Sequence, residues 1–547
     1  MNSVVRQSTV VLVVLTVALL LPPLARATTF IEMLSNQSPP RQNITPTAET
    51  ITVTTTEDLD TSLSATCVDN PGDPCTLRRA IVQARESTNK PVTIAFDLPT
   101  SDNGYDNTNQ VWVFEFSGIG SELRNPNGQV IIDGTTQSDN TGARPTTSGP
   151  AVFIRGTPTA NQFTNIVFDG DGNELRGVGF QYVGVQFNGN NNVIEDNWLG
   201  LTLDGTAIQF PLDDPERNNR AVISTAETPP GGDGNNTIQN NTVAGGRTGA
   251  IELRSDNSTV TGNNVGTRAD GTLPDVPENV VCSPTAQIAD NWFGGDGINV
   301  SGSNNTITGN VIMGLLVASN DANSTQAPAI EIGGSDNTAQ NNLIGVQEDD
   351  TRRWICGIGI RLTNEGQDVL GNQIYGARGE GAIAIFGTAA TIGSGGITIQ
   401  GNIIEESSPA IFFGPLVPER YANFNPAQIT SIDGTSVTGT NGPDGVIPPN
   451  ETFPSTCNGC TIEVFADDTD DTIETLELLG TTTSSTTDGT WSLTLSRELN
   501  TGEGLRTIST TSEFDQIQNL VAGTSTGVSV LYSSAETVYL PLIVTTP

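Results

Sequence analysis

The sequence predicts an all-β protein whose central part coils into a right-handed parallel β-helix, with an N-terminal helical cap and a C-terminal Ig-like β-sandwich. Two observations lead to this fold class. A six-residue pattern ending in asparagine recurs along the middle of the chain, and the composition combines 59 glycines with only 15% charged residues. Short repeats between turn-rich segments are typical of solenoids, in which each repeat forms one coil and stacks on the next.

The repeat has the form x-x-apolar-x-x-Asn and occurs eight times, always with an apolar residue two positions beyond the asparagine. We expect alternate apolar residues to face a common core. The asparagines should turn the corner in the left-handed conformation and hydrogen-bond from coil to coil. Segment 173–180 fits as an earlier coil, with Val178 in the asparagine position. The predicted ladder consists of Asn197, Asn241, Asn263, Asn291, Asn310, Asn342, Asn372 and Asn402.

Two general rules narrow the architecture. A string of β-sandwiches would repeat at about 100 residues, far more than the spacing of these asparagines. Connections between parallel strands are overwhelmingly right-handed, so the coils should wind that way. The sequence therefore favours one solenoid over an array of sandwich domains.

A second motif, Gly-x-x-x-Asp-(Gly/Asp)-Thr, follows three of the asparagines by three residues, at Gly200–Thr206, Gly266–Thr272 and Gly345–Thr351. The three loops should leave one corner of the solenoid, and insertions on one edge often form a binding face. Asp204, Asp270 and Asp349 are therefore candidate binding-edge residues. Ordinary aspartate turn chemistry explains the same residues and is the commoner interpretation.

An amphipathic helix is predicted just after Cys75. Thr76 is a suitable N-cap, and Leu77, Ile81 and Ala84 fall on one helical face. Strands are expected on either side, at 51–56 and 92–96. Because the end of a solenoid exposes open sheet edges, this helix is expected to be the N-terminal cap.

The cap sequence Cys75-Thr76-Leu77-Arg78-Arg79-Ala80 resembles the Cys-Ser-Leu-Arg-Glu-Ala (CSLREA) motif of bacterial secreted parallel β-helix proteins. Thr76 replaces the serine and Arg79 replaces the glutamate. The segment 130–137 resembles one that often follows this motif, and related phrases continue to about residue 405. The resemblance implies the fold and export from the cell, and it implies no single activity.

The chain divides into six predicted parts. Arg6, an apolar run and Ala25-Arg26-Ala27 are typical of a signal peptide, with a membrane anchor as the alternative. We expect a secreted or cell-surface protein without an integral membrane span in the mature chain. The parts are a signal peptide (1–27), a flexible linker (28–50), the cap and first coils (51–150), the β-helix (151–425), the Ig-like sandwich (426–533, with strands at 428–432, 461–466, 475–482 and 490–496) and a tail (534–547).

Six cysteines in an exported chain indicate disulfides. Cys67 and Cys75 flank a short loop and are expected to pair. Cys457 and Cys460 fit either a small disulfide loop or a redox-active C-x-x-C, and the lack of a βαβ pattern favours the loop. Cys282 and Cys356 remain, and they pair only if long loops fold back, because predicted coils separate them.

The charge balance excludes several functions. The net charge is −38, from 61 acidic and 23 basic residues, so the protein should repel the phosphates of nucleic acids. It contains no histidine, which excludes Ser-His-Asp and Cys-His catalysis and histidine metal sites. Carboxylate chemistry remains possible, and the charged residues near predicted coils are Arg247, Glu252, Arg254, Glu331 and Arg361.

Calcium is the cofactor that the sequence favours most, because Ca²⁺ prefers clustered carboxylate oxygens. The candidate ligands lie between two predicted strands of the sandwich, and a solvated acidic loop is the alternative. They are Asp467, Asp468, Asp470 and Asp471. Trp198, Trp292 and Trp354 follow ladder or loop motifs, where they would either stack on sugar rings or pack at corners.

Two functions are compatible with these residues. The first is a non-enzymatic extracellular protein with a binding, adhesive or structural role, directed toward polysaccharide or cell-surface components. The second is a carbohydrate-active enzyme, either a Ca²⁺-dependent lyase or a glycosidase with two carboxylates. No catalytic constellation stands out, so the first hypothesis is preferred.

Overall fold

The computed structural model describes residues 49–58, 66–68, 72–116, 128–137, 149–156, 164–207, 223–226, 234–244, 249–273, 293–294, 297–317, 328–388, 391, 396–407, 409–422, 424–441, 445–447, 451–453, 458–468, 470, 472–511 and 524–532. The predicted signal peptide (1–27) and tail (534–547) lie outside these residues. The second of the chain's two units, Glu49–Pro547, contains all of the described residues.

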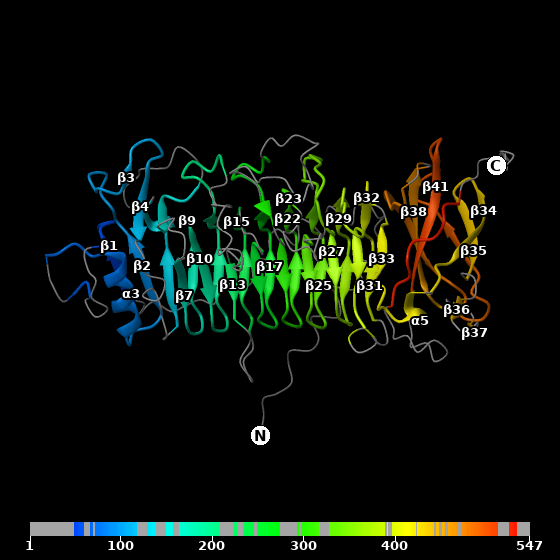
Figure 1. Ribbon diagram of the computed structural model, residues 1–547, viewed down its shortest axis with the longest axis horizontal. Helices are drawn as coiled ribbons and strands as arrows, with labels where there is room; N and C mark the ends of the chain where they lie inside the picture. The colour runs from blue at the N-terminus through cyan, green and yellow to red at the C-terminus, as the bar shows by residue number, and fades with distance from the viewer. Residues whose placement is uncertain are drawn as a thin grey trace, which may run out of the picture. The chain divides into compact units, whose positions relative to one another are not determined.

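Three long sheets form the body of the second unit (Figure 1). Sheet I contains β1 (Glu49–Val53), β2 (Val92–Phe96), β5 (Val130–Asp133), β8 (Glu174–Arg176), β11 (Val193–Glu195), β14 (Thr237–Gln239), β17 (Thr259–Thr261), β21 (Thr306–Thr308), β25 (Thr338–Gln340), β28 (Asp368–Leu370) and β31 (Thr398–Gln400). Sheet II contains β3 (Tyr105–Asp106), β4 (Val111–Phe116), β6 (Val152–Gly156), β9 (Val178–Gln181), β12 (Trp198–Leu199), β15 (Thr242–Val243), β18 (Asn264–Val265), β22 (Val311–Ile312), β26 (Leu343–Ile344), β29 (Gln373–Tyr375) and β32 (Ile403–Glu405). Sheet III contains β7 (Thr164–Phe168), β10 (Val183–Phe187), β13 (Ile223–Thr225), β16 (Ile251–Leu253), β20 (Ile298–Val300), β24 (Ile330–Ile332), β27 (Ile360–Leu362), β30 (Ile383–Ile385) and β33 (Ile411–Phe413).

From β5 onward each coil contributes one short strand to each sheet, and neighbouring coils pair in parallel, as in β11 with β14 and β16 with β20. Only the short β3 runs antiparallel to its neighbour, β4, within these three sheets. The prediction of a parallel β-helix is therefore confirmed. Strand β1 begins at Glu49, inside the predicted linker, because Glu49–Val53 pairs along its whole length with Val92–Phe96.

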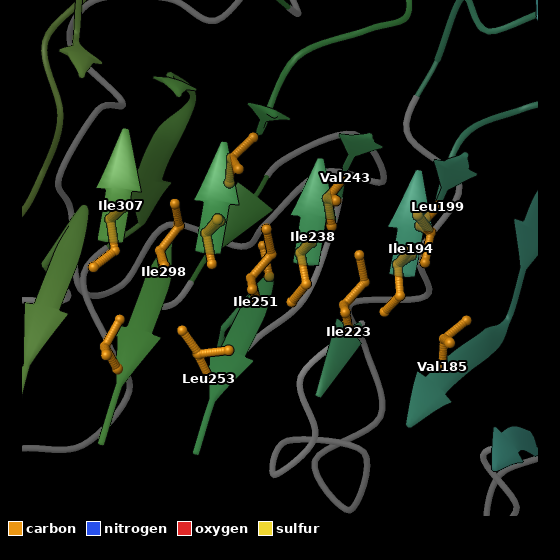
Figure 2. Packing of buried hydrophobic residues seen from close by; sticks show 14 of the residues in the cluster. Val185, Ile194, Leu199, Ile223, Ile238, Val243, Ile251, Leu253, Ile298 and Ile307 are labelled. Carbon is orange, nitrogen blue, oxygen red and sulfur yellow. The ribbon is translucent and has the colours of Figure 1, made fainter. Parts of the chain in front are cut away.

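The core follows from the alternation of side chains along each strand. In sheet I the middle residue of the three-residue strands is buried, as at Ile194 and Ile238. In sheet III the pattern is reversed, so Ile251 and Leu253 are buried and the residue between them faces outward. Figure 2 shows these aliphatic side chains converging from the different sheets in successive coils.

The asparagine ladder joins successive coils. From Asn197 to Asn372, each ladder residue donates its backbone N–H and its side-chain Nδ2 to the Oδ1 of the next ladder asparagine. Nδ2 also donates to a backbone carbonyl of the preceding coil, as from Asn241 to Ile194 at 3.0 Å. Val178 occupies the predicted place before the ladder, because its N–H donates to Asn197 Oδ1 at 3.0 Å.

The ladder asparagines do not themselves adopt the left-handed conformation, which corrects the sequence interpretation. The residue just before each one does so instead, as at Asp196 (φ 57°) and Gly309 (φ 63°). The left-handed residue reverses the chain direction, and the asparagine that follows directs its amide into the core. Corner turning and coil-to-coil bonding are therefore divided between two adjacent residues.

One predicted rung is wrong. Asn263 bonds directly to Asn310, and β18 pairs with β22, so no coil containing Asn291 lies between them. Asn291 itself lies outside the described residues. The segment around it belongs to an insertion of which the described part, β19 (Phe293–Gly294), pairs with β23 (Leu315–Val317) in a separate sheet.

A second ladder runs at the opposite end of sheet I and was not predicted. Its members begin the same six-residue pattern and are buried, and each accepts a backbone N–H from the preceding coil. It consists of Asn173, Asn192, Asn236, Ser258, Asn305, Asn337 and Gln367. Sheet I is therefore bordered by polar ladders at both strand ends.

The N-terminal cap forms as predicted. Helix α3 (Leu77–Glu86) begins after Thr76, whose side chain accepts the backbone N–H of Arg79. Leu77 and Ile81 are buried against the first coil. The disulfide between Cys67 and Cys75 is confirmed. Cys356 and Cys460 are also disulfide-bonded, and their predicted partners, Cys282 and Cys457, lie outside the described residues.

After β33 and the short helix α5 (Glu419–Ala422), the chain forms antiparallel sheets. These are β34 (Gln428–Asp433), β35 (Ser436–Thr440) and β40 (Trp491–Thr494); β36 (Gly445–Ile447) and β37 (Glu451–Phe453); and β39 (Glu477–Thr483), β38 (Thr461–Asp468) and β41 (Glu503–Thr510). The two three-stranded sheets share a core around Val464 and Trp491. The Ig-like assignment stays a prediction. No helix among the described residues is long and apolar enough to cross a membrane.

Candidate functional site

A row of polar side chains crosses the outer face of sheet III. It arises because the two flanking residues of each three-residue strand are buried, which leaves the middle side chain facing outward. Strand pairing places these middle residues directly beside one another, from coil to coil. The row, hereafter the sheet III row, consists of Ser224, Glu252, Asn299, Glu331 and Arg361.

The charges in the row are paired locally. Arg361 Nη1 lies 3.5 Å from Glu331 Oε1, and Asn299 Nδ2 donates to Glu331 Oε2 at 3.4 Å. Glu252 accepts Nε and Nη2 of Arg254, at 2.8 and 2.6 Å. Each glutamate therefore has an arginine partner, so the row is close to neutral although the whole chain carries −38.

Aromatic rings adjoin the arginine end of the row. The guanidinium of Arg361 stacks over Phe386 with 4.8 Å between its central carbon and the ring centroid, and the Phe386 and Phe412 centroids are 5.7 Å apart. Both rings are partly exposed. Along sheet III, Arg361 lies beside Ala384 on β30, and Ala384 lies beside Phe412 on β33. The surface thus combines hydrogen-bonding groups with an apolar platform, a combination found in ligand sites.

The predicted binding-edge aspartates form hydrogen bonds within their own loops. Hydrogen bonds from Thr272 lower the pKa of Asp270, and the backbone N–H of Thr351 lowers the pKa of Asp349 in the same way. Asp204 accepts Thr202 Oγ1 and the Thr206 N–H. These are the turn interactions expected of aspartate.

The loops themselves lie together, as the sequence predicts. All three follow strands of sheet II. The backbone N–H of Ala269 donates to the Gly205 carbonyl at 3.1 Å, and the Gln347 side chain donates to the Gly271 carbonyl. The loops therefore support one another along this corner.

The described tryptophans of the corner motifs are packing residues. Trp198 is half-buried and lies edge-on to Phe153, with ring centroids 6.5 Å apart. Trp354 lies beneath the guanidinium of Arg378, 3.3 Å from its central carbon. Trp292 lies outside the described residues. These contacts favour corner packing over sugar stacking for Trp198 and Trp354.

The predicted calcium ligands are only partly brought together. Carboxylates of Asp467 and Asp468 cluster with Glu474, which was not predicted. Asp470 is outside this cluster because its carboxylate accepts both the N–H and the hydroxyl of Thr472. Asp471 lies outside the described residues. Glu474 was missed because it follows the acidic run and reaches the cluster only through the turn of the chain.

Two carboxylates with raised pKa values lie at the end of the β-helix, where it meets the C-terminal sheets. Burial raises the pKa of Glu463 to about 7 and that of Glu474 to about 7. Both accept backbone N–H groups of the final coils, from Gly401 and Glu406 respectively. Their position indicates a role in joining the C-terminal sheets to the β-helix.

Comparisons with known proteins give only distant likenesses. No family model and no curated protein matches the sequence. Among solved structures, the Dettilon tailspike protein is 12% identical with a TM-score of 0.34, and the match covers 87% of this chain and 93% of that one. The A-module of the Azotobacter vinelandii mannuronan C-5 epimerase is 12% identical with a TM-score of 0.31, covering 59% and 85% of the two chains. An alginate lyase is 16% identical with a TM-score of 0.31, covering 56% and 68%. Scores this low carry no argument about function.

Proposed function

We propose that this protein is an extracellular polysaccharide-binding β-helix protein and that the sheet III row contacts the polymer. The observation that carries the proposal is the register of Glu252, Asn299, Glu331 and Arg361 on adjacent strands. Strands in a sheet are about 4.8 Å apart, so the row repeats hydrogen-bonding groups at a regular, short interval. A polymer with regularly repeated hydroxyl groups matches such an array.

The charge distribution narrows the class of polysaccharide. Glu331 is paired with Arg361 and Glu252 with Arg254, so the row offers donors and acceptors without a strong local charge. The net charge of −38 repels polyanions at long range. We therefore favour a neutral or amino-containing polysaccharide over a polyuronate. The Phe386 ring beside Arg361 supplies an apolar surface for a sugar face.

Extracellular placement rests on different features. The N-terminal sequence pattern is that of an export signal. The disulfide between Cys67 and Cys75, and the bonded state of Cys356 and Cys460, suit an oxidising compartment. Secretion would be checked by following the intact chain and its cleaved form in culture medium.

A carbohydrate-active enzyme is the second candidate, because two carboxylates lie in the same row. Glu252 and Glu331 stand on strands separated only by β20, so their backbones are roughly 10 Å apart. Inverting glycosidases use carboxyl groups about 6.5–9.5 Å apart, one of them protonated. Here each glutamate is already engaged in an ion pair, Glu252 with Arg254 and Glu331 with Arg361. Binding without hydrolysis is therefore preferred.

The test is affinity electrophoresis and calorimetry of the mature protein against neutral, amino-containing and polyuronate polymers. We expect binding to a member of the first two classes. A variant carrying Glu331→Gln and Arg361→Gln should bind about tenfold more weakly, the equivalent of about 1.4 kcal/mol. Asp368→Asn is the matched control, because Asp368 lies on the outer face of sheet I in the same coil as Arg361.

Three outcomes would change the conclusion. Failure of every polymer to bind contradicts the proposed function. Binding that the double variant leaves unchanged excludes the sheet III row as the contact surface. Release of new reducing ends, lost in Glu252→Gln and Glu331→Gln, establishes the enzyme in place of the binding protein.

A further inference from the structure

Three carboxylates converge where strand β38 ends. Asp467 and Asp468 are its last residues, and Glu474 approaches them from the segment that follows. One oxygen of each lies within 4.8 Å of the others. Two oxygens that each contact one Ca²⁺ at about 2.4 Å are at most about 4.8 Å apart. All three carboxylates are therefore near enough to share a single ion.

A buried oxygen in this group has no partner. Asp467 and Glu474 are 0% and 2% exposed. Asp467 Oδ2 accepts a hydrogen bond from Arg506 Nε, whereas Oδ1 is buried without a hydrogen-bond partner. A buried carboxylate oxygen left in this state is costly. A bound cation would satisfy the oxygen that Arg506 leaves free.

The charge of the group suits a divalent cation. Three carboxylates and the one guanidinium of Arg506 leave two uncompensated negative charges in a largely buried place. The donors are all oxygen, and Ca²⁺ accepts irregular oxygen coordination more readily than Mg²⁺.

The same segment contacts the last coil of the β-helix. The Glu474 carboxylate accepts the backbone N–H of Glu406 at 2.5 Å. Thr475 exchanges backbone hydrogen bonds with Ile404, and its hydroxyl donates to the Asn402 carbonyl at 2.9 Å. These contacts cover the edge of β32, which would otherwise expose unpaired backbone groups. An ion bound by Glu474 would hold this residue in place at the start of the segment that covers the edge of β32.

We propose that Asp467, Asp468 and Glu474 bind a Ca²⁺ ion that locks the C-terminal sheets onto the final coil of the β-helix. The ion joins the end of β38 to the segment that seals β32. Calcium thereby controls the stability of the junction, independently of any polysaccharide on sheet III.

The experiment uses the full mature chain, freed of metal with a chelator and then titrated with CaCl₂ or MgCl₂. We expect calorimetry to show Ca²⁺ binding and the melting temperature to rise by a few degrees in millimolar Ca²⁺, because the ion binds only the folded state. Hydrogen exchange should slow in peptides that contain Ile404 and Thr475. Mg²⁺ should have a smaller effect.

Two ligand variants and one control make the result specific. Glu474→Gln keeps an oxygen that can accept the Glu406 N–H and removes one negative charge from the cluster, so we expect the variant to fold and to lose the Ca²⁺ response. Asp468→Asn should lose the response as well. Asp433→Asn, an exposed carboxylate of β34, should respond like the unmodified protein. The proposal is overturned if Ca²⁺ has no effect on the unmodified protein, or if both ligand variants respond as it does.

Discussion

The side-chain amide of Asn310 donates to Asn342 Oδ1 in the next coil at 2.9 Å, and the backbone N–H of Asn310 donates to the same oxygen at 3.0 Å. Both residues are fully buried. The Asn342 Oδ1 thus accepts two hydrogen bonds. The Asn310 Nδ2 also donates to the carbonyl of Val260 in the preceding coil and to that of Thr308 in its own coil. The ladder gives polar groups a complete set of partners inside an apolar core.

Replacing Asn342 by leucine should therefore destabilise the β-helix. The change leaves the Asn310 amide and the Asn310 N–H without their shared acceptor, at a cost of about 1–3 kcal/mol. Urea unfolding followed by circular dichroism would measure it. Asn107→Leu, in an exposed turn, is the control and should be close to neutral. Equal midpoints for the two variants would contradict the structural role of the ladder.

The two ladders should differ in their sensitivity to truncation. Asn305 Nδ2 is buried without a hydrogen-bond partner, whereas Asn310 Nδ2 makes three hydrogen bonds. In the second ladder, Ser258 takes the place of an asparagine between Asn236 and Asn305, so a serine is already accepted at this position in a neighbouring coil. We expect Asn305→Ser to cost less than Asn310→Ser, by about 1 kcal/mol or more. Parallel urea titrations of the two variants would measure the difference, and equal or reversed midpoints would contradict a contribution from the amide contacts of Asn310.

The left-handed corner at Gly309 offers a test of backbone preference alone. Its φ is 63°, and an added Cβ would meet no atom within 4 Å. Gly309→Ala should cost about 1 kcal/mol through conformation and not through a clash. Gly309→Asn should cost less, because Asn240 and Asn341 adopt the same conformation at equivalent corners. Thermal melts in which alanine is tolerated better than asparagine would refute this explanation.

Burial of Glu463 should make stability fall as the pH rises. Burial raises its pKa to about 7, above the ordinary value of 4.5, so the folded protein holds this proton more tightly than the unfolded chain. The advantage is complete below about pH 4.5 and is lost as the pH rises through about 7. It amounts to about 3 kcal/mol at most.

Glu463→Gln should therefore raise the melting temperature at pH 8 more than at pH 5, because the amide needs no proton to accept the Gly401 N–H. Measurements in the presence of a chelator keep any metal effect separate. A pH profile unchanged by the substitution would show that Glu463 does not titrate in this range.

Arg361→Lys should weaken polymer binding without unfolding the protein. Lysine keeps the charge near Glu331 but loses the flat guanidinium that stacks on Phe386. We expect a several-fold loss of affinity with an unchanged melting temperature. Calorimetry with the polymer identified for the unmodified protein is the measurement, and unchanged affinity would remove Arg361 from the contact surface.

The periodic features of this chain could be predicted from its sequence, because the apolar spacing and the terminal asparagines are local signals. The cap was also predictable, since Thr76 and the apolar face beyond it lie within one short segment. The error at Asn291 has a physical cause: the hexamer specifies a local turn, whereas a rung also requires pairing with the coils before and after it. Register is a property of three segments and cannot be read from one.

The sheet III row is a second feature that depends on strand register and not on a local sequence pattern. Glu252, Glu331 and Arg361 each stand near a predicted coil, but no local spacing relates residues that lie in different coils with insertions of different length between them. Glu474 joins Asp467 only through the path of the chain at the end of β38. The second ladder is formed by the first residue of each hexamer, such as Asn192 and Asn236. It could not be predicted from the repeat, because only the last residue of the hexamer is the same in every copy.

The direct bond from Asn263 to Asn310 has a consequence for engineering. The chain between these rungs is 47 residues long, whereas the rungs at Asn241 and Asn263 are 22 residues apart, yet the hydrogen bonds are the same. The ladder therefore tolerates large changes in the length of a corner segment, since lengthening a loop costs little entropy. The corners between sheets II and III are natural places to graft a foreign peptide or domain, displayed at a chosen coil on a scaffold whose core stays unaltered.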